Sequence, residues 1–178
     1  MGIGTSRQED RPLTGLFRDR ESTEGAYRSL RDRGYTDDEI NVMMSDETRD
    51  KYYKDSDVVV DDTMAAEGAA TGGAIGGTLG AIIGGIAAIG TNVIIPGLGL
   101  VVWGPIAAAL AGAGAGGATG GLVGALVGWG IPEERAKLYD EGIRSGGAVV
   151  GVTPRTPEDA EYFENEWRNN YRGEHVYR

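Results

Sequence analysis

The sequence predicts an α+β fold in which a small charged domain is interrupted by a long, uncharged helical hairpin. Two observations lead to this prediction. The 65 residues between Glu67 and Glu133 carry no charge, so all 44 acidic and basic residues lie in the other 113 positions. Within the charged part, short apolar runs alternate with segments whose apolar residues recur at helical spacing. The chain therefore combines a charged domain, split in two, with an apolar insert.

The first half of the charged domain is expected over residues 12–62, after a polar N-terminal tail over residues 1–11. Asp19 and Ser22 are candidate helix caps, and Gly34 is typical of a helix end. In order, we expect a strand over 12–17, a helix from Asp19 or Ser22 to about 33, a strand over 40–44, a short polar helix or loop over 45–53, and a further strand or a lead into the insert over 58–60.

The second half is expected over residues 131–178. Pro132 suits the first position of a helix, and Thr156 before proline and two acids is a strong helix start. We expect a helix from Pro132 to about 146, a strand over 148–153, a helix from about 156 to 171, and an edge strand over 174–177.

Without the insert, this order of strands and helices is typical of a ferredoxin-like split β-α-β domain. We expect its helices to cover one face of the sheet. The aromatic and methionine side chains of the charged part are then core residues, namely Phe17, Met43, Met44, Tyr162, Phe163 and Trp167.

These segments resemble the bacterial general stress protein domain of the YflT type, over most of residues 12–155. The resemblance rests on LTGLF (13–17), GYTDDEINV (34–42), GIPEE (130–134), YDEG (139–142) and SGGAVV (145–150). It implies a role under stress. It brings no catalytic residues and no cofactor.

The insert over residues 63–130 contains two runs in which glycine recurs every fourth residue. Such a repeat keeps glycine on one stripe of a helix, where a second helix can approach closely. We expect a hairpin of two helices, about 65–90 and 105–129, each roughly 37 Å long at 1.5 Å per residue. The expected packing glycines are Gly68, Gly72, Gly76, Gly80, Gly84, Gly112, Gly116, Gly120, Gly124 and Gly128. The expected tip and interface residues are Ile94, Ile95, Leu98, Leu100, Trp103 and Trp129.

A domain of about 100 residues is too small to bury these helices, so lipid or other copies of the chain must cover them. Homo-oligomer assembly is the favoured interpretation because the tip carries no charge and the flanks lack a Lys/Arg excess. The alternative is a membrane-inserted hairpin that modifies or permeabilises the bilayer. We accordingly expect the protein either as an assembly in the cytoplasm or in a membrane with its charged domain in the cytoplasm.

The sequence does not predict catalytic chemistry. With no cysteine and one histidine, His175, we expect no metal site and no cofactor, and the chain is not expected to be an enzyme. The G-x-G-x-x-G match at residues 112–117 follows from glycine density and lacks a preceding strand. A net charge of −10 argues against nucleic acid as a partner. The sequence thus favours a non-enzymatic, stress-associated protein that assembles into a ring, shell or filament, with a small-ligand sensor as a third interpretation.

Overall fold

The computed structural model describes residues 11–53, 93–95, 99–107 and 121–178. The predicted strand at 58–60, the first predicted arm, Leu98 and residues 108–120 of the second arm lie outside these ranges. The described chain forms one six-stranded sheet in the order β3-β4-β2-β5-β1-β6, and every neighbouring pair is antiparallel. Helices accompany it, so the α+β class is confirmed.

The elements of the charged domain lie where the sequence predicts them. They are β1 (Leu13–Phe17), α1 (Arg20–Asp32), β2 (Ile40–Ser45), α2 (Asp46–Tyr53), α7 (Glu133–Arg144), β5 (Ala148–Val152), α8 (Pro157–Asn169) and β6 (Glu174–Tyr177). The predicted caps are also present. The Asp19 side chain accepts a hydrogen bond from the Ser22 N–H, and the Thr156 side chain accepts one from the Asp159 N–H. Local capping chemistry therefore sets the starts of α1 and α8.

The connections place each helix between two strands that are not neighbours. Helix α1 joins β1 to β2, and β5 lies between these two strands and pairs with both. Helix α8 joins β5 to β6, and β1 lies between them. The central strand β5 thus comes from the chain after the insert, so both halves of the charged domain contribute to one sheet.

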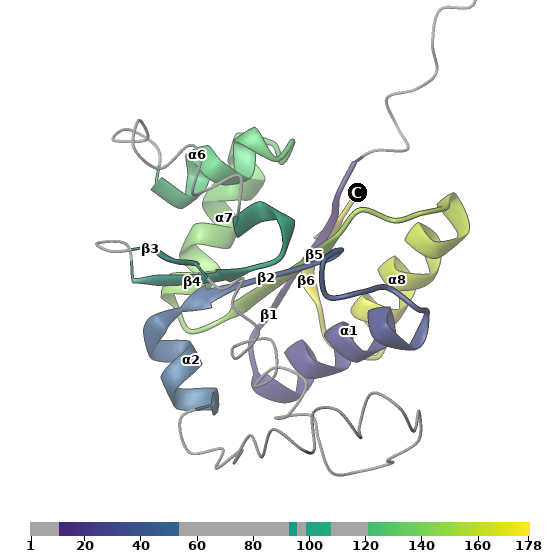
Figure 1. Ribbon diagram of the computed structural model, residues 1–178, viewed down its shortest axis with the longest axis horizontal. Helices are drawn as coiled ribbons and strands as arrows, with labels where there is room; N and C mark the ends of the chain where they lie inside the picture. Colours follow the sequence, from purple (N-terminus) through teal and green to yellow (C-terminus); the bar gives the residue numbers. More distant parts are fainter. Residues whose placement is uncertain (1–10, 54–92, 96–98, 108–120) are drawn as a thin grey trace, which may run out of the picture.

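Helices cover both faces of the sheet, which corrects the prediction of a single covered face. Helices α1 and α8 lie on one side, and α6 (Gly121–Gly128) and α7 lie on the other (Figure 1). Along β5, Val150 packs in the cluster with α1 and α8, whereas Val149 packs with α6 and α7. Strands buried on both faces are apolar throughout rather than alternating. The runs INVMM and AVVGV carry that signal in the sequence.

The segment predicted as the tip of a helical hairpin instead extends the sheet. Residues Val93–Ile95 form β3 and Leu100–Trp103 form β4, and β4 pairs with β2 from Val42↔Trp103 to Ser45↔Leu100. The residues expected at the hairpin tip are therefore strands of the same sheet as the charged domain. β-Branched side chains favour a strand when a neighbouring strand is available to pair.

Candidate functional site

The described parts of the insert are anchored on the sheet, and this anchored region is the candidate site. Of the predicted tip residues, Ile94 and Ile95 lie in β3, while Leu100 and Trp103 lie in β4. Leu100 is buried in the cluster that α6 and α7 form against the sheet. The described parts of the insert, which are β3, β4 and α6, therefore belong to the fold of the charged domain.

A close backbone contact follows β4. Gly104 has a φ of +93°, and a Cβ at this position would overlap the carbonyl oxygen of Ile40. The buried Asn41 side chain holds the next turn, because its Oδ1 accepts a hydrogen bond from the Ile106 N–H at 2.8 Å. Its Nδ2 donates to the carbonyl oxygen of Gly151 at 3.4 Å. One asparagine thus links β2, β5 and the turn after β4.

Helix α6 and the turn after it pack on the same face. Leu122 and Leu126 are buried, and the Ile131 N–H donates to the Leu126 carbonyl at 3.0 Å to close the helix end. The predicted interface residue Trp129 lies against β5, where a Cβ on Gly151 would stand 2.6 Å from indole Cη2. Trp129, expected among the tip and interface residues of the hairpin, thus has its ring against the sheet.

The outward face of α6 carries the part of the predicted packing stripe that the structure describes. A Cβ on Gly124 or Gly128 would meet nothing within 4 Å. Val127, on the same helix face, is 43% exposed. The other predicted packing glycines lie outside the described residues, namely Gly68, Gly72, Gly76, Gly80, Gly84, Gly112, Gly116 and Gly120. Within the described residues, α6 therefore presents a flat and apolar outer face that nothing covers.

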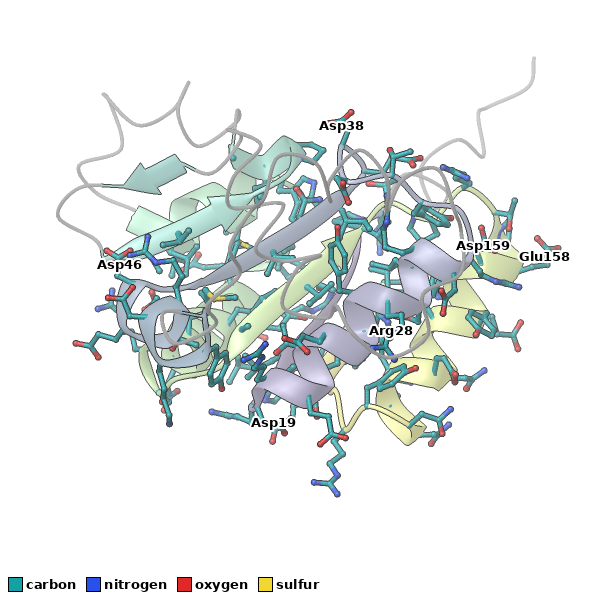
Figure 2. The ribbon with its side chains drawn as sticks, turned by 60° about the horizontal axis from the view of Figure 1, so that its bottom comes forward. Asp19, Arg28, Asp38, Asp46, Glu158 and Asp159 are labelled. Atoms are coloured by element: carbon teal, nitrogen blue, oxygen red, sulfur yellow. The ribbon has the colours of Figure 1, made fainter. Side chains whose placement is uncertain are left out.

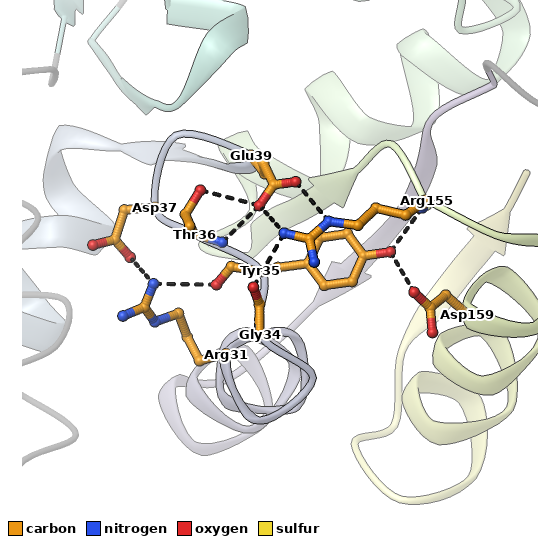
Figure 3. Close-up of polar contacts among 8 residues, drawn as sticks. All are labelled: Arg31, Gly34, Tyr35, Thr36, Asp37, Glu39, Arg155 and Asp159. Carbon is orange, nitrogen blue, oxygen red and sulfur yellow. Dashed lines mark hydrogen bonds and ion pairs between the residues drawn. The ribbon is translucent and has the colours of Figure 1, made fainter. Parts of the chain in front are cut away.

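A polar cluster joins two loops at one end of the sheet, and the sequence interpretation missed it (Figure 3). The buried Tyr35 hydroxyl donates to Asp159 Oδ2 at 2.7 Å and accepts from the Arg155 N–H at 2.7 Å. Arg155 Nε donates a hydrogen bond to Glu39 Oε1 at 2.8 Å, and the guanidinium carbon lies 4.3 Å from the centre of the Tyr35 ring. Glu39 also accepts from the Thr36 N–H at 2.8 Å. The Thr-x-x-Glu spacing at 36–39 was the one local signal for this cluster.

The charges and protonation states of this cluster favour a structural role. We call Tyr35, Glu39, Arg155 and Asp159 together the Tyr35 clasp. The hydrogen bonds from Arg155 and Thr36 lower the pKa of Glu39 to about 2, so the carboxylate stays charged at ordinary pH. Burial raises the pKa of Tyr35 to about 12, so its hydroxyl stays protonated. A permanent anion and a permanent donor do not exchange protons near neutral pH. The cluster therefore holds the loop after α1 against the start of α8.

Four acidic side chains lie at the starts of three separate helices. Asp19 lies at the start of α1, Asp46 at the start of α2, and Glu158 and Asp159 at the start of α8 (Figure 2). Acids at helix N-termini are stabilised by the helix dipole. Among the described residues, no group of three or more His, Asp or Glu side chains is placed to hold a metal ion.

The single histidine, His175, has a structural role through its backbone. Its carbonyl oxygen accepts a hydrogen bond from the Tyr139 hydroxyl at 2.6 Å, and its backbone has a φ of +49°. The Tyr139 hydroxyl also lies 2.8 Å from Thr14 Oγ1. This buried contact ties α7 to β1 and β6.

In the described part of the chain, no helix combines the length and apolar character needed to cross a bilayer.

Comparisons with known proteins find no relative of this chain. No protein-family model, curated protein or solved structure matches the chain.

Proposed function

We propose that the chain is a non-enzymatic protein that assembles with copies of itself through its glycine-rich insert, carried on a ferredoxin-like domain. The observation behind this proposal is the outer face of α6. Gly124, Val127 and Gly128 make that face apolar, and no described residue covers it, although the helix packs toward the sheet by its opposite face. A face of this kind permits the close approach of a second helix.

The ferredoxin-like part of the proposal is supported by the order β6-β1-β5-β2 and by the two helices that each bridge an intervening strand. In this view, β3 and β4 are an addition of the insert at the β2 edge. The stress-associated role rests on the resemblance of residues 12–155 to the general stress protein domain. We propose that the assembly is a ring, shell or filament in the cytoplasm.

The proposal is tested by particle mass. Gly124→Leu with Gly128→Leu fills the open face of α6, and we expect the particle mass in sedimentation velocity to fall. Both glycines have helical backbone and open surroundings, so each leucine raises helix propensity by about 0.8 kcal/mol and the fold is retained. Asn165→Leu, on an exposed position of α8, is the matched control and should leave the mass unchanged.

An unchanged mass in the double variant, with wild-type protein that assembles, would contradict a contact through α6. The bilayer alternative has its own outcome. If the protein rises with lipid when a detergent-free lysate is floated after an alkaline carbonate wash, the insert lies in the bilayer. That result would replace the model of a soluble assembly.

A further inference from the structure

The six-stranded sheet is built from two parts of the chain whose strands alternate. The N-terminal part, the described residues of 11–107, supplies β1, β2, β3 and β4, and the C-terminal part, residues 121–178, supplies β5 and β6. Strand β5 lies between β2 and β1, and β1 lies between β5 and β6 (Figure 1). Among the described strands, β1, β5 and β6 therefore pair only with strands of the other part. Neither part can complete its backbone pairing without the other.

Buried side chains also join the two parts on both faces of the sheet. On the face of α1 and α8, Trp167 Nε1 donates to Ser29 Oγ at 3.1 Å, and the rings of Trp167 and Phe17 meet edge to face with their centres 5.6 Å apart. On the other face, a Cβ on Gly142 of α7 would lie 2.4 Å from the Leu16 side chain of β1, so this helix and strand are in close contact. The C-terminal part therefore completes the core of the N-terminal part, and apolar burial drives their association.

The covalent link between the two parts is the 13 residues 108–120. A link of this length reaches roughly 45 Å when extended, whereas a domain of about 110 residues is roughly 35 Å across. It is therefore long enough for the C-terminal part to reach the N-terminal part of a neighbouring copy. The N-terminal part is also made first, so the place between β1 and β2 is empty until a C-terminal part from the same or another copy fills it.

Exchange between copies needs a further contact, because a link of this length gives closure within one chain an effective concentration on the order of millimolar. Helix α6 supplies a candidate for that contact. It begins at Gly121, directly after the link, and no described residue covers its outer face at Gly124 and Gly128. Because the two links of an exchanged pair cross at its two-fold axis, the two α6 helices are brought close together.

We propose that two copies of the chain exchange their C-terminal parts, so that β5 and β6 of each copy complete the sheet of the other. Each contact within the fold is kept, and only the chain that provides it changes, which makes such an exchange a low-cost route to a dimer. The inference rests on the proposed function, assembly through the insert, and deepens it. The helical contact at α6 then joins two chains whose sheets depend on each other.

A disulfide between the two parts tests the exchange directly, because the chain has no cysteine of its own. Val42 of β2 lies directly opposite Val150 of β5, and both are buried on the same face. Opposite residues of an antiparallel pair have Cα atoms about 4.5–5.5 Å apart, within the range that a disulfide bridges. The test variant carries Val42→Cys and Val150→Cys and is oxidised at a concentration at which wild-type protein sediments as an assembly. We expect it to run on a denaturing, non-reducing gel at twice the 18.7 kDa of one chain.

Val42→Cys with Val149→Cys is the matched control. Val149 packs on the opposite face of the sheet, so this variant should run as a single chain with two free thiols. If wild-type protein assembles but the test variant runs as a single chain with an internal disulfide, exchange is wrong and assembly through α6 stands. Free thiols in the oxidised test variant would contradict the pairing of β2 with β5 on which the inference depends. If wild-type protein has the mass of one chain, both proposals are overturned.

Discussion

Replacing Gly104 by alanine tests the anchoring of the insert on the sheet. At φ +93° a Cβ costs about 1–2 kcal/mol in backbone strain. The same Cβ would overlap the Ile40 carbonyl and stand 2.9 Å from Asn41 Oδ1, which adds about 1–3 kcal/mol of overpacking. Displacing the turn also breaks the bond from the Ile106 N–H to Asn41, worth about 1 kcal/mol. We expect Gly104→Ala to lower the free energy of unfolding by about 3–6 kcal/mol.

Gly130 is a matched control for this variant. Its φ is +96°, but a Cβ there would meet nothing within 4 Å, so Gly130→Ala carries the strain without the overlap. The control should lose about 1–2 kcal/mol. Urea unfolding followed by circular dichroism gives both values, and a difference of about 2 kcal/mol or more corresponds to a Tm gap of at least about 4 °C. Agreement of the two variants within about 0.5 kcal/mol would refute the close packing of the turn after β4 on β2.

Three further variants probe the charged domain by the same unfolding measurement. Tyr35→Phe removes the hydroxyl that joins Asp159 to the Arg155 N–H and should cost about 1–2 kcal/mol; no loss would contradict the clasp. Glu39 has a folded pKa of about 2 against an ordinary 4.5, so its contribution is complete above pH 4.5 and is lost as the pH falls toward 2. Arg155→Ala should therefore make the loss of stability between pH 5 and pH 2 less steep, and equal slopes in both proteins would count against the pair. Trp167→Ala removes the largest fully buried side chain of the described residues and should cost about 3–5 kcal/mol, more than Tyr35→Phe; a smaller loss would mean that the core relaxes around it.

The sequence predicted those elements whose signals are local. Helix α8 follows from Thr156 and Pro157 at its start, and β5 from the run AVVGV with glycines before it. Capping and β-propensity act within a few residues, so one short segment is enough to recognise them.

The rest depended on partners that are distant in the chain. Residues 100–103 became a strand because β2, more than 50 positions earlier, offers an edge to pair with. The insert is apolar on all sides, so its periodicity could not distinguish a remote helix from one packed on the sheet. The Tyr35 clasp joins residues more than 110 positions apart, and no spacing in the sequence connects them.

The place of β5 in the sheet has a consequence during synthesis. It pairs with β1 and β2, yet it follows β2 by about 100 residues, and at 5–20 residues per second a ribosome takes about 5–20 s to make that interval. The apolar insert is made within that interval, before the strand that organises its docking surface exists. A nascent chain with 65 uncharged, glycine-rich residues and no sheet to cover them is exposed to premature association. We therefore expect this protein to depend on chaperones while it is being made, more than its modest size would suggest.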